Sequence, residues 1–248
     1  MNVPKHPTVR LMTWNIHGAV GRNPRFDLAR VVHLIKRHEP DIVALQEVDS
    51  RRPREAGTEN PFDVLQKALG EHGVGAKSVT TADGDYGQTL ISRWPMNNTD
   101  ICDISYRARE PRRAIHTEIA TPFGPLRVVT AHFGLSIRER HSQAKTVLSL
   151  IGKADMTTVV LGDFNDWLWA GSVRNRLARI LPGHTPHRTF PSACPLFHLD
   201  TIYCRPGPAL VRSHTDHSAR SLSDHLPVIA DICMKAARER EKAVERAA

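Results

Sequence analysis

Two side chains capable of acid-base and ligand chemistry follow a strongly apolar run in the segment VVLGDFNDW, residues 159–167. The run has the composition of a buried strand, and Asp163 and Asn165 stand two positions apart at its end. Because side chains alternate across a strand, both would point to one side and Phe164 to the other. The competing interpretation is a turn, since glycine, aspartate and asparagine are common in turns. The first interpretation places a carboxylate and a carboxamide at one edge of a sheet.

Polar residues of the same kinds lie at other predicted strand ends. They are Asn15 and His17 after VRLMTW, Gln46, Glu47 and Asp49 at the end of DIVALQEVD, His132 after LRVVTA, and Asp224 and His225 ahead of LPVIADI. Active sites are commonly built from strand ends and loops that a rigid sheet holds in place. We therefore interpret these ends as parts of one predicted site.

The residue types at these ends favour a hard divalent cation. Carboxylate and carboxamide oxygens are typical ligands of Mg²⁺ or Mn²⁺, whereas zinc sites usually recruit His and Cys at close spacing. A divalent ion with Asp and His in reach supplies charge neutralisation, an activated water and a protonated leaving group, which phosphate-ester hydrolysis requires. The pattern therefore predicts a metal-dependent phosphoesterase.

The elements that must position these ends can be predicted from hydrophobic periodicity. Strands are expected over residues 9–14, 41–46, 88–92, 114–119, 126–131, 158–161, 199–204 and 227–232. Helices are expected over residues 26–35, 137–151 and 173–181. Paired strands, as across the turn TPFGP at 121–125, are mixed with helical crossovers, which indicates a mixed α/β or α+β domain. We assign one domain to residues 1–234 and a charged tail to residues 235–248.

The order of the motifs resembles that of the endonuclease/exonuclease/phosphatase superfamily, which includes exonuclease III-type AP endonucleases, pancreatic deoxyribonuclease, inositol polyphosphate 5-phosphatases and neutral sphingomyelinases. The matching segments are TWNIHG, LQEVD, YGQTLISR, TAHFGLS, LGDFND, LDTIY and SDHLPV. They come from separate predicted strands, so they have no shared structural reason to recur together in this order. The resemblance implies a DNase I-like four-layer α-β-β-α sandwich of two mixed sheets, with a metal site at one edge.

The resemblance also implies a set of metal ligands. Glu47 would be the principal ligand, with Asn15 beside it in the inner shell or bonded to the phosphate. Asp224 would lie at the metal or at an adjacent second site. The implied cofactor is Mg²⁺ or Mn²⁺.

The same resemblance implies the catalytic residues. Asp163 would orient or deprotonate the attacking water, and Asn165 would hold a phosphate oxygen. His225 would contact the scissile phosphate, oriented by Asp200 of the segment LDTIY, and His132 would serve the leaving oxygen. The implied phosphate-binding residues are thus Asn165, His132 and His225.

The sequence departs from the family pattern at a few positions. His17 stands where AP endonucleases carry an acid, and Gln88 stands where related sequences often carry Asn. A tyrosine near this point reaches the phosphate in some members, and Tyr86 either does the same or lies beside the site. No insertion that would carry the base-wedging loops of AP endonucleases is evident, which disfavours abasic-site repair.

Other residues near the motifs allow two interpretations each. His17 and Asp166 either contact the substrate or only lie near the site, and Trp167 and Trp169 fit a stacking platform or an anchor in the core or a loop. Basic residues that could line a phosphate-binding rim, although exposed arginines are common, are Arg112, Arg113, Arg138 and Arg140.

Composition restricts the class of protein and its partners. The chain has 248 residues and a net charge of +8, which favours a polyanionic partner. Its four cysteines form no C-x-x-C pair, so free thiols are expected instead of a disulfide framework or a zinc ribbon. No apolar run approaches the roughly 20 residues of a membrane span, and no signal peptide is recognisable. We therefore expect a cytoplasmic protein without stable membrane insertion. A monomer is expected as well.

The substrate hypotheses differ in class. Net charge, together with the resemblance of His132 to the histidine of the deoxyribonuclease-like branch, favours phosphodiester bonds of DNA or RNA. The short chain and the TAHFGLS segment favour a phospholipid headgroup or a small phosphorylated metabolite. A nucleic-acid-binding domain with an inactive site is the non-enzymatic alternative, and binding without metal-dependent turnover would indicate it.

Overall fold

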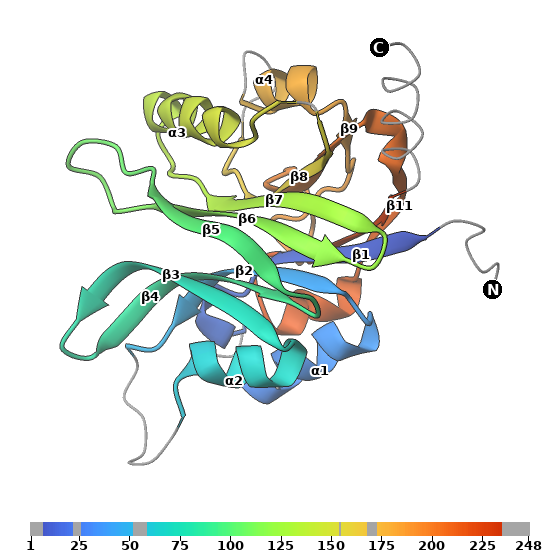
Figure 1. The fold of residues 1–248 in the computed structure, drawn as a ribbon. Helices are drawn as coiled ribbons and strands as arrows, with labels where there is room; N and C mark the ends of the chain where they lie inside the picture. The colour runs from blue at the N-terminus through green and yellow to red at the C-terminus, as the bar shows by residue number, and fades with distance from the viewer. Residues whose placement is uncertain (1–6, 22–25, 52–58, 154, 168–172, 235–248) are drawn as a thin grey trace, which may run out of the picture.

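Two six-stranded sheets pack face to face, and helices cover the outer side of each sheet (Figure 1). The computed structural model describes residues 7–21, 26–51, 59–153, 155–167 and 173–234. The first sheet has the strand order β11-β12-β1-β2-β4-β3, and the second has the order β5-β6-β7-β8-β10-β9. Each sheet contains parallel and antiparallel neighbours. The predicted four-layer sandwich of mixed sheets is confirmed.

The strands of the first sheet are β1 (Thr8–Asn15), β2 (Ile42–Asp49), β3 (His72–Thr81), β4 (Gly84–Ser92), β11 (Leu210–Thr215) and β12 (Val228–Cys233). Those of the second are β5 (Met96–Asp103), β6 (Arg113–Thr121), β7 (Gly124–His132), β8 (Thr157–Asp163), β9 (Gly183–His184) and β10 (Asp200–Arg205). The α-helices are α1 (Leu28–Arg37), α2 (Pro61–Leu69), α3 (Ile137–Leu150) and α4 (Val173–Ile180). Short 3₁₀ helices span His17–Ala19 (η1), Gly207–Ala209 (η2) and His217–Ser221 (η3).

Strand direction brings the predicted site residues to one edge of the sandwich. β1 and β2 are parallel and joined through α1, and β7 and β8 are parallel and joined through α3. Parallel strands end at the same edge of a sheet. β10 and β12 run antiparallel to β8 and β1, so their beginnings lie at that edge. Four strand ends and two strand beginnings therefore converge.

Three layers of apolar contacts hold the sandwich together. A central cluster, which includes Leu11, Leu90, Val128 and Leu161, fills the space between the sheets. A second packs α1 and α2 on the first sheet, and a third packs α3 and α4 on the second. Sheet strands with buried residues on both faces account for the nearly continuous apolar runs of the sequence.

Every strand and helix predicted from periodicity is present, and several further elements are not predictable in that way. The helix α2 starts at Pro61 after the cap residue Asn60, whose side chain accepts a hydrogen bond from Phe62 N. The strand β5 is an edge strand made mostly of exposed polar residues, and β3 is an edge strand with little alternation. Edge strands need not bury apolar side chains, so periodicity misses them. The predicted tail 235–248 lies outside the described residues.

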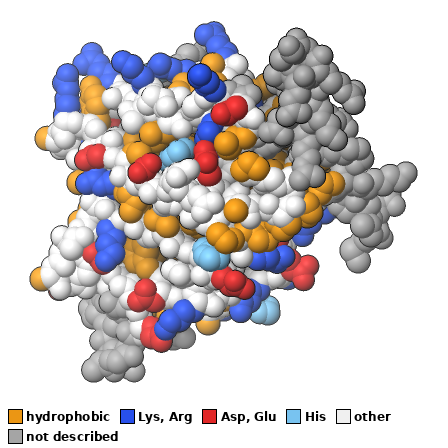
Figure 2. Space-filling model, viewed as in Figure 1, with side chains coloured by type: hydrophobic (Ala, Val, Ile, Leu, Met, Phe, Trp, Pro, Cys, Tyr) orange, Lys and Arg blue, Asp and Glu red, His pale blue; other side chains and the backbone are white. Residues whose placement is uncertain are grey.

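Two surface properties bear on partners. None of the described helices is long and apolar enough to cross a membrane. Figure 2 shows Lys and Arg side chains gathered over α3 and α4.

The four cysteines are free, as expected.

Candidate active site

Asp163 lies at the centre of the converging strand ends. In the register of the second sheet it is paired with His132 on β7 and with Asp200 on β10. From the first sheet, Nδ2 of Asn15 donates to Oδ2 of Asp163 at 3.0 Å and to Oε1 of Glu47 at 2.8 Å. The Asn15 amide therefore bridges two carboxylates that belong to different sheets. The structure brings these predicted residues together.

A bulge in β2 directs Glu47 toward this centre. The register between β2 and β4 shifts between Leu45 and Val48, and Glu47 has a φ of +57°. His17 and Asn165 also have a positive φ, of 48° and 49°. Such left-handed backbone is uncommon for residues other than glycine, costs about 1–3 kcal/mol each and is concentrated at functional sites.

A close strand contact precedes Asp163. Gly162 has a φ of +146°, and a Cβ atom there would lie 1.9 Å from the carbonyl oxygen of Ala131 on β7. Only glycine fits this position. Asp163 follows it and is buried, and burial together with the nearby Asp200 carboxylate raises the pKa of Asp163 to about 6. A carboxylate with this pKa is a better proton acceptor than an exposed aspartate.

Asp200 and His225 form a buried pair between the two sheets. Nδ1 of His225 lies 2.7 Å from Oδ2 of Asp200, and Nε2 of His225 lies 3.8 Å from Oδ2 of Asp163. Burial alone would lower the pKa of His225, but the charges of Asp200 and Asp163 raise it to about 10. His225 is therefore an imidazolium ion whose Nε2–H faces the site.

His132 has a different environment, because its partner is a cation. Nη1 of the buried Arg112 lies 2.9 Å from Nδ1 of His132. Burial and the Arg112 charge lower the pKa of His132 to about 3. Its Nε2 faces the carboxylates, at 3.5 Å from Oδ2 of Asp163 and 3.9 Å from Oε1 of Glu47. His132 is therefore neutral.

Asn165 places a second donor beside His132. Its backbone N–H donates to Oδ1 of Asp163 at 2.9 Å, and its Nδ2 donates to the carbonyl oxygen of Phe133 at 2.8 Å. The same Nδ2 lies 3.3 Å from Nε2 of His132. Two neighbouring nitrogen groups at a buried site are suited to hold one phosphate oxygen.

The oxygen donors that open to solvent lie around Glu47. Nδ1 of His17 is 3.5 Å from Oε2 of Glu47 and 3.6 Å from Oδ1 of Asp224. Burial alone would raise the pKa of Glu47, but the hydrogen bonds from His17 and Asn15 help lower it to about 2. The Glu47 carboxylate is thus ionised, and the Asp224 side chain is more exposed than that of Glu47. Carboxylates with room for waters fit Mg²⁺, which keeps several waters when bound.

A second group of possible ligand atoms comprises Asp163, Asp200 and His225, all within 4.8 Å of one another. In this group Nδ1 of His225 and Oδ2 of Asp200 are engaged with each other. Oδ1 of Asp200 has no hydrogen-bond partner among the described residues. The open carboxylates of Glu47 and Asp224 fit a hydrated cation better than this closed pair does.

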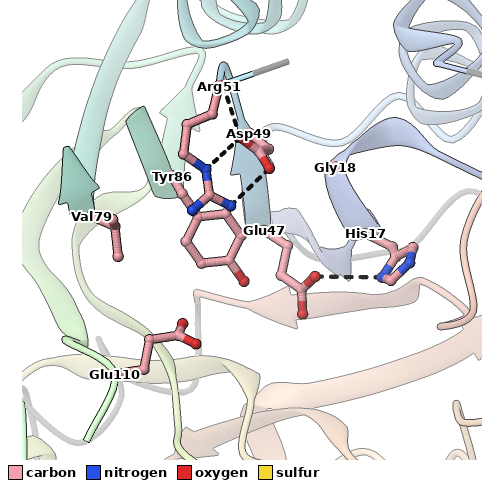
Figure 3. Close-up of a pocket in the computed structure, with 8 residues that line it drawn as sticks. All are labelled: His17, Gly18, Glu47, Asp49, Arg51, Val79, Tyr86 and Glu110. Carbon is pink, nitrogen blue, oxygen red and sulfur yellow. Dashed lines mark hydrogen bonds and ion pairs between the residues drawn. The ribbon is translucent and has the colours of Figure 1, made fainter. Parts of the chain in front are cut away.

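A cavity of about 420 Å³ adjoins Glu47 and His17 (Figure 3). The guanidinium of Arg51 lies 4.6 Å from the centre of the Tyr86 ring, and its Nε and Nη2 each donate to Asp49 at 2.9 Å. Tyr86 and Glu110 also line the cavity. The cavity is large enough for a substrate group next to the phosphate.

The structure keeps other predicted residues away from this centre. Gln88 is buried and donates from Nε2 to the carbonyl oxygen of Arg113, which links the two sheets. Arg113 forms an ion pair with Asp103, and Arg140 donates to the carbonyl oxygen of Leu135. Arg138 is exposed on α3. Gln88, Arg113 and Arg140 make contacts within the fold, and Arg138 lies on its surface.

The segment after Asn165 is structural as far as it is described. Oδ2 of Asp166 accepts the backbone N–H of Arg174 at 2.9 Å. The ring of Trp167 packs edge-on against Phe190 and Phe197, with centroids 5.3 and 5.2 Å apart. Trp167 is thus a loop anchor, and Trp169 lies outside the described residues.

Sequence reasoning missed residues that support the site. Oγ of Ser223 donates to the carbonyl oxygen of Asn15 at 2.7 Å and accepts the backbone N–H of His225 at 3.1 Å. The ring of Phe190 packs against His225 with centroids 4.8 Å apart. The position of Ser223, directly before Asp224 and His225, was an available signal, whereas Phe190 and Arg51 come from loops without a pattern.

Comparison with known proteins finds similarity along most of the chain. The model of the endonuclease/exonuclease/phosphatase family matches residues 12–225. The uncharacterized protein YbhP of Escherichia coli K12 is 29% identical over 243 residues, covering 90% of this chain and 95% of YbhP.

Solved structures with the same fold include an endonuclease/exonuclease/phosphatase from Beutenbergia cavernae, with 21% identity, a TM-score of 0.73 and coverage of 92% of this chain and 72% of that one. The human Nocturnin catalytic domain has 19% identity, a TM-score of 0.65 and coverage of 91% and 93%, respectively. The Nocturnin structure contains a bound sulfate anion.

Proposed function

Because the chain belongs to the endonuclease/exonuclease/phosphatase family, we propose that it is a Mg²⁺-dependent phosphodiesterase with its active site around Asp163. The observation that supports this most directly is the Asn15 amide, which holds Glu47 and Asp163 together across the two sheets. A carboxylate for the cation and a carboxylate for the water are thereby placed side by side. Mn²⁺ is the alternative cation.

Glu47 and Asp224 are the residues that would hold the cation, with Asn15 as a further ligand or as the link between carboxylates. A divalent ion bound there would neutralise phosphate charge and lower the pKa of a bound water. The neighbouring His17 contacts both carboxylates.

The remaining residues act on the water and the phosphate. Asp163 accepts a proton from the water, whose oxygen attacks phosphorus while the bond to the leaving oxygen breaks. The leaving oxygen keeps the electron pair of that bond and takes up a proton from bulk water. The raised pKa of Asp163 suits this step. His225, held by Asp200, stabilises the charge that develops on the phosphate.

His132 and Asn165 bind from the other side. With Nδ1 facing Arg112, the hydrogen of neutral His132 is on Nε2, which can donate to a phosphate oxygen or the leaving oxygen. Nδ2 of Asn165 supplies a neighbouring donor. In this assignment His132 donates a hydrogen bond to the substrate and transfers no proton.

Nucleic acid is the first substrate hypothesis. The net charge of +8 and the histidine at position 132 favour a phosphodiester in DNA or RNA. The second hypothesis is a phospholipid headgroup, favoured by Leu135, which is 67% exposed in the loop that leaves His132. Cytoplasmic location and a monomeric state stay predictions from the sequence.

Hydrolysis assays with Mg²⁺, Mn²⁺ or EDTA test the proposal. The substrates are plasmid DNA, RNA, bis-p-nitrophenyl phosphate, p-nitrophenyl phosphate and anionic phospholipid vesicles. We expect EDTA to abolish activity and Asp163→Asn to lower it roughly 10²–10⁴-fold. Asp166→Asn is the matched control, because an asparagine oxygen can still accept the Arg174 N–H. Full turnover by folded Asp163→Asn would contradict the assigned role.

A further inference from the structure

The two outer helical layers of the sandwich differ in electrostatic character. In the layer of α1 and α2, three basic side chains pair with acids, namely Arg30 with Asp27, Arg37 with Asp216 and Lys67 with Glu59. In the layer of α3 and α4, the only acid on the two helices is Glu139, which is buried. The exposed cations of this layer form no ion pair within the described part of the chain, and they are Arg138, Lys145, Arg176 and Arg179. We call this layer the α3–α4 face (Figure 2).

Exposed aliphatic side chains adjoin two of these cations in the sequence. Leu135, Ile137 and Ile180 are 67%, 52% and 46% exposed, and Arg138 and Arg179 are the sequence neighbours of Ile137 and Ile180. A cavity of about 320 Å³ lies between the ends of the two helices. Its lining combines Leu148, Ile151 and Ile180 with Arg176, Arg179 and Arg205. Positively charged and apolar side chains thus line the same cavity.

We propose that the α3–α4 face docks on an anionic lipid bilayer. The cations would bind the acidic headgroups, and the aliphatic side chains would enter the headgroup boundary, which is how interfacial proteins bind. The cavity would accept one lipid phosphate between Arg176 and Arg179, with apolar atoms of the lipid against Ile180. A nucleic acid would account for the arginines, but it offers little to exposed leucine and isoleucine. In addition, neither helix carries Phe, Tyr or Trp for base stacking.

The α3–α4 face borders the proposed active site. Leu135 and Ile137 lie in and after the short loop that leaves His132 at the end of β7. Arg140 of α3 donates to the carbonyl oxygen of Leu135 and approaches Oδ1 of Asp166 at 3.9 Å. Docking through this face would therefore hold the site at headgroup level. This consequence rests on the proposed function and favours its second substrate hypothesis, whereas docking itself needs no turnover.

Vesicle sedimentation with full-length Asp163→Asn protein tests docking without hydrolysis. Vesicles of phosphatidylglycerol mixed with phosphatidylcholine are compared with pure phosphatidylcholine. We expect binding to the anionic vesicles only, and a loss of about one to two orders of magnitude when Arg176→Gln and Arg179→Gln are combined. The matched control combines Arg30→Gln and Lys67→Gln, which remove the same charge from the opposite layer. A further variant, Ile137→Ser, should weaken binding without changing the charge.

The possible outcomes separate the two proposals. Equal vesicle binding by the Arg176/Arg179 variant and its control would overturn docking through this face. Binding of duplex DNA instead of vesicles, with the same sensitivity to Arg176 and Arg179, would overturn the lipid assignment and make the face a nucleic-acid surface. The arginine variants in an otherwise wild-type chain should retain hydrolysis of soluble bis-p-nitrophenyl phosphate. Absence of that hydrolysis in the wild type would contradict the proposed function while leaving vesicle binding measurable.

Discussion

Nη1 of Arg112 lies 2.9 Å from Nδ1 of His132, and a guanidinium can only donate hydrogen bonds. Nδ1 must therefore accept, and the single hydrogen of the neutral ring is on Nε2. Nδ2 of Asn165, 3.3 Å from Nε2, then donates to the carbonyl oxygen of Phe133 and not to His132. Arg112→Met removes the donor and should lower kcat about 10–100-fold with little change in KM. Arg112→Lys keeps a donor and should retain more activity. The ¹⁵N chemical shifts of His132 should show one tautomer in the wild type and a mixture in Arg112→Met.

Arg113→Lys provides the control for this prediction. Arg113 is the next residue but pairs with Asp103, away from His132. Its replacement should change neither kcat nor the His132 shifts. An unchanged tautomer in Arg112→Met would contradict the positioning role even if the activity fell.

Removal of the Glu47 carboxylate should abolish stabilisation by the divalent ion. A ligand present at a hundred times its Kd stabilises the native state by about 2.7 kcal/mol, which corresponds to a rise in Tm of about 5–10 °C for a domain of this size. We expect this rise with Mg²⁺ or Mn²⁺ in the wild type and none in Glu47→Gln, measured by differential scanning fluorimetry. Glu110→Gln alters another acid of the same cavity and should keep the full response. Equal shifts in the wild type and Glu47→Gln would place the ion elsewhere.

The Asp200–His225 pair should behave as one catalytic unit. Asp200→Asn removes the charge that holds His225 protonated, and His225→Asn removes the imidazolium itself. Each should lower kcat by roughly 10²–10⁴-fold, and the double variant should lose little more than His225→Asn alone, because residues that act together are strongly non-additive. The measurement is a double-mutant cycle of kcat, with circular dichroism to verify folding. Additive losses would mean that the two residues act independently.

Asp216 should make the stability depend on pH. Burial opposes its ionisation, but hydrogen bonds from His38, Ser218 and Arg37 hold the pKa of Asp216 well below its usual value of 3.8. A depressed pKa in the folded state gives stability above the unfolded-state pKa, and this stability is lost as pH falls through the folded-state value. Asp216→Asn should therefore lower the free energy of unfolding by about 1–3 kcal/mol at neutral pH, and the difference should shrink below about pH 4.

Urea unfolding at neutral and acidic pH measures this effect, with Asp83→Asn as the exposed control. The same difference between Asp216→Asn and the wild type at both pH values would show that the carboxylate charge is not what stabilises the contact. The test also concerns the site, because Asp216 connects the end of α1 to η3, the segment that leads to Asp224 and His225.

The sequence predicted the strands that are buried on both faces, because a continuous apolar run such as that before Gly162 is typical of a strand covered on both sides. It also predicted that polar residues from distant segments would meet, since Asn15, Asp163 and His225 follow or precede such strands. The sequence could not show which side chains contact each other at the site. Arg112 and His132 are twenty positions apart, and only the pairing of β6 with β7 brings them together.

Backbone conformation was equally beyond sequence reasoning. Glu47 occupies a bulge with left-handed φ, and nothing in LQEVD signals it, because glutamate has no preference for that conformation. The Phe190 contact with His225 arises in a loop without periodicity, so no pattern could predict it. The exposed strands β3 and β5 were missed for the related reason that they bury little.

The Asn15 bridge between Glu47 and Asp163 implies that hydrolytic activity begins only after both sheets have folded and packed together. Neither sheet alone contains the set of groups needed for hydrolysis, because Glu47 lies on the first sheet, with His225 just before its strand β12, whereas Asp163, Asp200 and His132 lie on the second. A folding chain in which only one of the two sheets has formed cannot hydrolyse the substrate, even if the strands of that sheet are native. Turnover would then start abruptly when the second half closes on the first, so the onset of hydrolysis during refolding would time the final docking event of the molecule.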